Sequence, residues 1–414
     1  MEYDQVLAAI HSRRTFSSSA SLERITRLMD RLGNPQDQIR CIHVAGTNGK
    51  GSVCALVESA LRQSGYRVGL FTSPYLVDFR ERIQIDRTMI SQEQLVACYE
   101  TVMEAEERLE QEGMEPVNEF ELVTALGFVA FQRAEVDYAV IEVGLGGRCD
   151  ATNVIKSPEV CCITSISLDH VDVLGHTVGE IAGEKAGIIK PGRPVVMARQ
   201  APEAEAVIRQ RAEELGSPLV ETGRWRLLEE SLICQRIGDG SRELLLQLLG
   251  RFQADNAGAA WEVCRLLGLE ELAVRQGFFH ASWPGRLQYV PGSPEMLIDA
   301  GHNPAGITAL CQVLDTYFLG QNVIGVMAMM GDKAHQECVP MVARRCHTLI
   351  AATVGLPRSL TPEQLAREAA PYCPVRTANS VAEGIQLARA LASPDDLILV
   401  AGSVYAAGEA LQTI

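Results

Sequence analysis

The 414-residue sequence has no run of about 18 consecutive apolar residues, the length that a membrane-spanning helix requires. Its start, residues 1–16, places acidic residues before any apolar run and lacks a small-residue cleavage site, so we expect no signal peptide. None of the 12 cysteines forms a C-x-x-C pair. We therefore expect reduced thiols in a cytoplasmic protein rather than disulfides or a zinc site.

Positive charge is also in deficit. The chain carries 37 Lys and Arg against 52 Asp and Glu, a formal net charge of −15. Because an acidic surface repels phosphate backbones and anionic lipid, we expect neither nucleic acid nor a membrane as a partner. An anionic small molecule can still bind where positive charge is concentrated locally.

The order of apolar runs predicts an α/β protein. Runs typical of buried strands cover residues 39–45, 68–71, 138–143, 160–166 and 195–198, and helical patterns cover 52–64, 92–111 and 120–133. This alternation predicts a mostly parallel sheet with helices on both faces. Prolines and glycines interrupt it at 283–294, and the alternation then restarts. We therefore predict a larger N-terminal domain, residues 1–290, and a smaller C-terminal α/β domain, residues 291–414.

A glycine-rich loop follows the first strand. It reads Gly46-Thr47-Asn48-Gly49-Lys50-Gly51-Ser52 and leads directly into a helix. Such a loop can turn several backbone N–H groups toward one anion, and the helix N-terminus adds partial positive charge. Lys50 would neutralise phosphate oxygens and Ser52 would face the magnesium of a nucleotide. The alternative is a glycine-rich turn without a ligand.

The loop departs from the G-x-x-x-x-G-K-[ST] pattern, because Val44 stands at the first glycine position and Gly51 precedes Ser52. It resembles instead the GTNGKGS loop of folylpolyglutamate synthase/dihydrofolate synthase, the folate branch of the Mur ligase superfamily. Further matches follow in the same order: Thr72-Ser73-Pro74 with Glu81-Arg82-Ile83, residues 142–153 with Cys149 in place of leucine, residues 163–192, residues 299–304 and residues 401–405. The resemblance implies a P-loop-type ATP-binding domain followed by a smaller Rossmann-like domain.

The resemblance also implies a site for ATP and for two Mg²⁺ ions. The residues implied for ATP are Gly46, Thr47, Asn48, Gly49, Lys50, Gly51, Ser52, Asn256, Arg286 and Asp299, and those implied for metal are Ser52, Ser73, Glu142 and His170. Glu142 ends a buried strand at the edge where open α/β sheets bind ligands, and Mg²⁺ prefers oxygen donors. Taken alone, Glu142 could equally cap a helix, and His170 could be a structural histidine.

Four residues are implied in catalysis: Lys50, Lys185, His302 and Ser403. Lys185 lies in a helical pattern, where a lysine is usually solvated. In the family the matching lysine is carbamylated, so that it becomes a carboxylate analogue able to support a second Mg²⁺. Burial would lower the pKa of the amine and favour that reaction.

Two segments are implied to contact the pteroate part of an acceptor. They are Asn118-Glu119-Phe120-Glu121, where the family has Thr at the first position, and Cys149-Asp150-Ala151. Phe120 could pack against the acceptor ring, or it could be a core anchor of its own helix.

The resemblance implies a ligase that uses ATP to convert a carboxylate into an acyl phosphate, which the amine of L-glutamate then attacks. We expect a monomer acting on dihydropteroate and on (tetrahydro)folates. Folylpolyglutamate synthase activity alone, and a nucleotide-binding regulator without ligase activity, stay open as alternatives. A cell-wall Mur ligase is disfavoured because only about 40 residues precede the loop, too few for an additional domain. A dinucleotide-dependent oxidoreductase is disfavoured because no G-x-G-x-x-G follows a strand.

Overall fold

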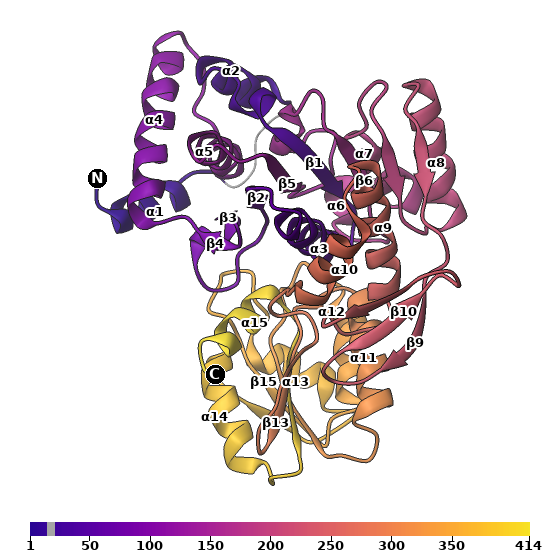
Figure 1. The fold of residues 1–414 in the computed structure, drawn as a ribbon. Coiled ribbons are helices and arrows are strands. Elements are labelled where there is room, and N and C mark those ends of the chain that lie inside the picture. Colours follow the sequence, from indigo (N-terminus) through magenta and orange to yellow (C-terminus); the bar gives the residue numbers. More distant parts are fainter. Residues whose placement is uncertain (15–20) are drawn as a thin grey trace. The chain divides into compact units, whose positions relative to one another are not determined.

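The computed structural model describes residues 1–14 and 21–414. By the density of internal contacts the chain forms two compact units (Figure 1). The first comprises Met1–Tyr75, Phe79–Trp225 and Asp255–Ala281, and the second comprises Leu76–Asp78, Arg226–Ala254 and Ser282–Ile414. The division at residue 290 stays a prediction. The compact units differ from it, since residues 226–254 group with the second unit and the last change of unit lies at residue 282.

The first unit is built on an eight-stranded sheet with the order β4-β3-β2-β5-β1-β6-β7-β8. Its strands are β1 (Arg40–Ala45), β2 (Val68–Phe71), β3 (Ile83–Ile85), β4 (Thr88–Met89), β5 (Tyr138–Glu142), β6 (Val160–Ile163), β7 (Val195–Met197) and β8 (Leu219–Glu221). The six strands from β2 to β8 in the sheet order are parallel, and β3 and β4 add an antiparallel edge. The predicted mostly parallel sheet is confirmed.

Helices cover both faces of this sheet. They are α1 (Tyr3–His11), α2 (Glu23–Arg31), α3 (Lys50–Gln63), α4 (Gln92–Gln111), α5 (Glu119–Arg133), α6 (Val171–Leu174), α7 (Val178–Ala186), α8 (Pro202–Glu214), α9 (Gln253–Leu266) and α10 (Glu271–His280), with short 3-10 turns η1 (Pro35–Gln38), η2 (Phe79–Arg82) and η3 (Ala151–Val154). One apolar core lies under α1, α2, α4 and α5, and another lies under α6, α7 and α8. Helix α10 approaches α3 so closely that a Cβ atom on Gly277 would lie 2.5 Å from Cα of Ala60.

The strand predicted at 160–166 ends earlier, at Ile163. The backbone N–H of Thr164 still bonds to the carbonyl of Ala45 in β1, whereas the carbonyl of Ser165 and the N–H of Ser167 bond to the loop that follows β1. Backbone groups that serve the loop are not available to a neighbouring strand, so the strand stops where those contacts begin.

The second unit contains a six-stranded sheet with the order β12-β13-β17-β14-β15-β16. Its strands are β12 (Gln288–Val290), β13 (Glu295–Ile298), β14 (Val323–Met327), β15 (Thr348–Ala351), β16 (Val375–Thr377) and β17 (Leu397–Ala401), and its helices are α11 (Pro304–Tyr317), α12 (His335–Ala343), α13 (Pro362–Ala369), α14 (Val381–Leu391) and α15 (Val404–Leu411). All strands except β12 are parallel to their neighbours, and apolar cores lie on both faces. This architecture confirms the predicted second α/β domain.

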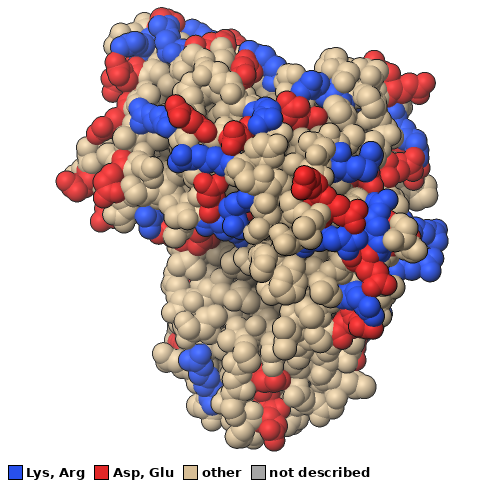
Figure 2. Space-filling view, viewed as in Figure 1, with Lys and Arg blue, Asp and Glu red and all other residues tan. Residues whose placement is uncertain are grey.

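A small antiparallel sheet, which the sequence analysis did not predict, also belongs to the second unit. It consists of β9 (Arg226–Glu230), β10 (Gln235–Gly238) and β11 (Glu243–Leu246) in the order β11-β10-β9. None of the 12 cysteines, all of which lie in the described residues, forms a disulfide, and most of them are buried. On the face shown in Figure 2, acidic and basic side chains are interspersed where they occur, and a large part of the face carries few charged side chains. Among the described residues, no helix is both long and apolar enough to cross a membrane.

Candidate functional site

The glycine-rich loop between β1 and α3 adopts a backbone that requires two of its glycines. Gly46 has φ of 151°, and a Cβ atom there would lie 1.8 Å from Oγ1 of Thr164. Gly49 has φ of 89°, in the left-handed region, and a Cβ atom there would lie 2.2 Å from Oδ1 of Asn256. Any side chain at either position would clash, so the loop can close onto its neighbours only with glycine. Asn256, predicted for the ATP pocket, packs directly against this loop.

The segment after β6 holds the same loop from the side. The carbonyl of Ser165 accepts hydrogen bonds from the backbone N–H groups of Thr47 (2.9 Å) and Asn48 (3.3 Å). The hydroxyl of Thr164 donates to the carbonyl of Asn48 at 2.8 Å. Gln200 braces this segment, since its side chain accepts from the N–H of Ile166 (3.0 Å) and donates to the carbonyl of Thr164 (2.8 Å). The sequence analysis missed both Thr164 and Gln200.

Lys50 is the first residue of α3, and Gly49 is the N-cap. The Nζ atom of Lys50 donates to the carbonyls of Gly46 (3.2 Å) and Thr47 (3.3 Å). The same atom lies 4.0 Å from Oε1 of Glu142. An ammonium group therefore stands at the N-terminus of a 14-residue helix, beside backbone turned by glycines, which is an arrangement suited to an anionic phosphate. Ser52 follows in the first turn and is buried.

Glu142 ends β5 and is only 5% exposed. Besides its approach to Lys50, its Oε2 atom accepts a hydrogen bond from the backbone N–H of Ser73 at 3.3 Å. Strand β5 lies between β2 and β1, so these residues meet at the carboxyl ends of adjacent parallel strands. The structure thus brings together Lys50, Glu142 and Ser73, three of the predicted site residues.

His170 is the N-cap of α6, with φ of 50°, and its side chain is 40% exposed. Its Nε2 atom lies 3.9 Å from Oδ1 of Asp169. Within residues 1–14 and 21–414, no group of three or more His, Cys, Asp and Glu side chains is placed to hold a metal ion. A Mg²⁺ site does not require such a group, because this ion commonly binds through one or two carboxylates, waters and the phosphates of a substrate. The buried Glu142 carboxylate lies beside the glycine-rich loop at residues 46–52, which we call the phosphate loop, and it fits that pattern.

Lys185 is buried in α7, with 4% exposure, and is not a solvated lysine. Its Nζ atom donates to the carbonyl of Gly46 at 2.8 Å. Burial, and secondly the positive charge of Lys50, lower the pKa of the amine to about 7, against the opposing influence of Asp169 and Asp150. A substantial fraction of the Lys185 amine is therefore neutral near pH 7, which is the form that can react with CO₂.

The polar residues of the first predicted acceptor segment bond within the protein. Asn118 caps α5, since its Oδ1 accepts from the N–H of Glu121 (2.9 Å), and Oε2 of Glu121 accepts from the N–H of Asn118 (2.8 Å). Glu119 approaches Nδ1 of His11 at 3.2 Å. Phe120 projects toward the next loop, because a Cβ atom built on Gly144 would lie 2.4 Å from its ring.

Asp150, in the second predicted segment, is 6% exposed and organises its own loop. Its carboxylate accepts from the N–H of Leu145 (2.8 Å), the N–H of Thr152 (3.0 Å) and the hydroxyl of Thr152 (2.5 Å). The Thr152 hydroxyl also lies 2.9 Å from Nε2 of the fully buried His43. Burial, and secondly the charge of Lys190, lower the pKa of the His43 imidazole to about 3, so this histidine is neutral. Neither His43 nor Thr152 was predicted.

The two neighbours of Asp150 in this predicted segment differ in exposure. Cys149 is partly exposed, whereas Ala151 is buried as the first residue of η3.

The predicted residues of the second unit gather at the carboxyl ends of β13 and β17, which are adjacent strands. Asp299 is buried and accepts hydrogen bonds from the N–H groups of Leu287 and Gly301, both at 2.9 Å. Burial raises the pKa of Asp299, and the charge of Arg286 opposes that shift most strongly. Nδ1 of His302 lies 3.0 Å from the carbonyl of Ala300.

Ser403 completes this group as the N-cap of α15, where its Oγ atom accepts from the N–H of Ala406 at 3.0 Å.

A cavity of about 660 Å³ lies elsewhere in the second unit, between α12 and α13 and the loop before α13. Residues His335, Arg358, Thr361, Arg367 and Glu368 are among those that line it. It contains none of the predicted site residues, and the sequence analysis did not identify it.

Two protein-family models match the sequence. The Mur ligase middle domain matches residues 44–264, and the Mur ligase glutamate ligase domain matches residues 285–404.

Individual proteins are similar over the full length. The sequence is 34% identical to a dihydrofolate synthase/folylpolyglutamate synthase of Bacillus subtilis, with 97% of each chain covered. The structure is similar to a Mycobacterium tuberculosis folylpolyglutamate synthase complexed with ADP, with a TM-score of 0.91, 34% identity and 99% and 98% of the two chains covered. It is also similar to E. coli FolC in complex with DHPP and ADP, with a TM-score of 0.89, 30% identity and 100% and 97% of the chains covered.

Proposed function

Because this chain belongs to the folylpolyglutamate synthase/dihydrofolate synthase branch of the Mur ligase family, we propose that it joins L-glutamate to folate-type acceptors. It is an ATP-dependent ligase that forms ADP and phosphate. The observation that carries the proposal is the meeting of Lys50, Glu142 and Lys185 around the phosphate loop. A loop that merely turned the chain would not require a buried lysine and a buried carboxylate beside it.

The reaction proceeds through an activated carboxylate, since an amine does not displace hydroxide from a carboxylate at neutral pH. An oxygen of the acceptor carboxylate attacks the γ-phosphorus of ATP, and the bond from that phosphorus to the β,γ-bridging oxygen breaks. The glutamate amine then attacks the acyl phosphate, loses a proton and expels phosphate. Lys50 stabilises the charge that develops on the transferred phosphoryl group.

We assign Mg²⁺ to the carboxylate of Glu142 and the hydroxyls of Ser52 and Ser73, with His170 as a further ligand. When bound, the metal supplies electrostatic stabilisation of the phosphate oxygens. Glu142 suits this role because its carboxylate is buried at the edge of the phosphate loop, where Lys50 already balances its charge.

We assign a carbamate to Lys185. The neutral amine would attack the carbon of CO₂, forming an N–C bond and releasing one proton. The lowered pKa and the burial of Lys185 support this step, because both favour the neutral amine over the ammonium ion. The product would add a carboxylate beside the phosphate loop and could support a second Mg²⁺.

In the second unit we assign Arg286 to a phosphate, Asp299 to the nucleotide, and His302 and Ser403 to the active site. Their grouping at the carboxyl ends of β13 and β17 supports this assignment. Open α/β sheets bind ligands at that edge.

For the acceptor we propose both dihydropteroate and (tetrahydro)folates, with Phe120 and the loops around Asn118 and Asp150 forming part of the site. The double name of the Bacillus subtilis relative and the DHPP in the E. coli complex support the bifunctional form. Folylpolyglutamate synthase activity alone is the second candidate. We also propose that the enzyme is cytoplasmic and that it is a monomer. Light scattering of the purified protein would test the monomeric state.

The deciding experiment measures glutamate-dependent ADP release with MgATP, supplying dihydropteroate and tetrahydrofolate in separate reactions. The bifunctional proposal expects release with each acceptor and none without glutamate. Release with tetrahydrofolate alone would leave the narrower activity. Nucleotide binding without release in either reaction would favour a regulator and contradict the proposal.

A further inference from the structure

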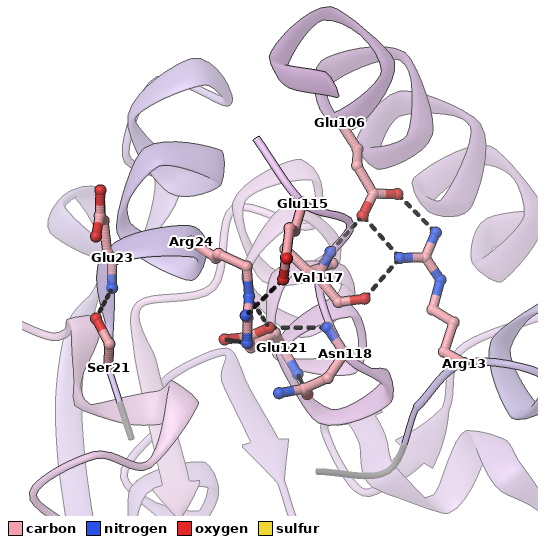
Figure 3. A network of polar contacts seen from close by, with 9 residues as sticks. All are labelled: Arg13, Ser21, Glu23, Arg24, Glu106, Glu115, Val117, Asn118 and Glu121. Atoms are coloured by element: carbon pink, nitrogen blue, oxygen red, sulfur yellow. Dashed lines mark hydrogen bonds and ion pairs between the residues drawn. The ribbon is translucent and has the colours of Figure 1, made fainter. Parts of the chain in front are cut away.

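Two arginine–carboxylate pairs hold the short segment that leads into α5 (Figure 3). On one side, Glu106 of α4 is fully buried and accepts from both terminal nitrogens of Arg13, at 2.7 and 2.6 Å. The same carboxylate accepts from the N–H of Val117 at 2.8 Å, while Arg13 donates to the Val117 carbonyl at 2.9 Å. Both backbone groups of Val117 are thereby held by the pair.

On the other side, Arg24 of α2 donates two hydrogen bonds to the carboxylate of Glu121 (Figure 3). Its Nε atom bonds to Oε2 and its Nη2 atom to Oε1, each at 3.3 Å. Glu121 is 4% exposed, and its carboxylate also accepts from the N–H of Asn118 in the cap of α5. Arg24 therefore orients the carboxylate that closes the first turn of α5. A planar guanidinium can hold both carboxylate oxygens at once, which fixes direction as well as distance.

Phe120 lies inside this turn, between Asn118 and Glu121, so the turn sets the direction of its ring. The ring contacts Gly144, where a Cβ atom would lie only 2.4 Å away. Gly144 lies two positions after Glu142, the carboxylate beside Lys50. A displacement of the first turn of α5 would therefore move a ring that borders the loop at the reaction site.

We infer that Arg24 is a positioning residue for the acceptor: through Glu121 it holds the first turn of α5, and with it Phe120, against the Gly144 loop. The inference rests on the proposed function and goes beyond it, because it gives Arg24 a role that acts through Glu121. A change of about 1 Å in such a contact can cost up to about a hundredfold in rate.

The test compares Arg24→Ala, Arg24→Lys and Glu121→Gln with the wild type, using whichever acceptor the wild type turns over. Arg27→Ala is the matched control, because Arg27 lies on the same helix and its pair with Glu112 is exposed, at 3.5 Å. We expect Arg24→Ala to raise KM for the acceptor about tenfold while KM for ATP stays within about twofold. Arg24→Lys should lie between the wild type and Arg24→Ala, and Glu121→Gln should resemble Arg24→Ala.

Hydrogen exchange of the ligand-free protein supplies a readout that does not depend on activity. The amides of Asn118 and Glu121 should exchange faster in Arg24→Ala than in the wild type or in Arg27→Ala. A fall in kcat with every KM unchanged, together with a lower melting temperature, would reduce Arg24 to a stabilising residue and overturn the inference. Unchanged exchange at both amides would also overturn it. If the wild type turns over neither acceptor, the proposed function fails separately, and the exchange result still decides the role of Arg24.

Discussion

Lys50 and Lys185 donate hydrogen bonds to the same atom, the carbonyl oxygen of Gly46, at 3.2 and 2.8 Å. Two ammonium groups on one acceptor repel each other, and the charge of Lys50 accordingly contributes to the lowered pKa of Lys185. Lys50 has Glu142 nearby and the partial charges of the loop carbonyls around it, whereas Lys185 is the more buried of the two. Burial is the larger cause of the lowered pKa of Lys185, and the two lysines are suited to different tasks.

Removing the charge of Lys50 should abolish turnover without unfolding the protein. We expect Lys50→Ala to lower kcat by roughly a hundredfold to a thousandfold, because the transferred phosphoryl group loses its cation. ADP release measures the effect, and thermal unfolding checks that the fold persists. Lys156→Ala is the control, since that lysine pairs with Asp37 at the surface. Near-normal turnover by Lys50→Ala would contradict the role of Lys50 in stabilising the transferred phosphoryl group.

Lys185→Ala should be nearly inactive, because it removes the group that we propose to be carbamylated. Added acetate or formate should restore part of the activity by placing a carboxylate in the space that the side chain leaves. The restoring effect is measured as ADP release against carboxylate concentration, with Lys50→Ala as the control that should not respond. An active Lys185→Ala variant would contradict the role.

The pKa of Lys185 also predicts how stability depends on pH. Its pKa is about 7 in the folded state against an ordinary value of 10.5, so between these limits the unfolded chain binds more protons. The cost of burying the charged form is complete below pH 7 and is lost as the pH rises toward 10.5, so the stability of the wild type should increase over this range.

Lys185→Met abolishes this contribution. In CO₂-free buffer without nucleotide, the free energy of unfolding of the wild type should gain a few kcal/mol relative to Lys185→Met between pH 6.5 and 9.5. Denaturant titrations at the two pH values measure the gain, and Lys156→Met should show none. Parallel pH profiles for the wild type and Lys185→Met would show that the lysine keeps its ordinary pKa.

Replacing Gln200 should raise KM for ATP more than KM for the acceptor. Its side chain braces the segment that holds the phosphate loop, through hydrogen bonds to Ile166 and Thr164. Losing both bonds costs about 1–3 kcal/mol, so we expect Gln200→Ala to raise KM for ATP roughly 5-fold to 150-fold, with KM for the acceptor nearly unchanged. Gln210→Ala, at an exposed position on α8, is the matched control. Equal increases in both KM values would point to a general loss of structure.

Phe120→Ala distinguishes the two acceptors. A folate offers the γ-carboxylate of its glutamate, which lies several ångströms beyond the carboxylate that dihydropteroate offers, so the pterin rings must dock differently if one ATP site serves both. We expect Phe120→Ala to impair the dihydropteroate reaction more than the folate reaction, as measured by kcat/KM for each. Tyr372→Ala, which removes a partly exposed ring from the second unit, serves as the control. Equal losses would identify Phe120 as a helix anchor.

The sequence by itself determined the features that depend on neighbouring residues. The loop at 46–52 follows a strand and opens a helix as predicted, and helix α4 has the bounds that its local pattern indicated. Alternating apolar segments were enough to predict the two α/β sheets, because strand and helix periodicities are local and parallel strands need helical connections. The family followed from motifs that are themselves short and contiguous.

Only the tertiary structure decided which of these residues meet. Lys185 is 139 positions away from the carbonyl that it binds, so no local pattern could distinguish it from a solvated lysine. Arg24 and Glu121 are similarly remote, 97 positions apart. Both pairs depend on where the sheet order places distant segments, and it is that burial, absent from any short stretch of sequence, which sets the pKa of Lys185 and the constraint on α5.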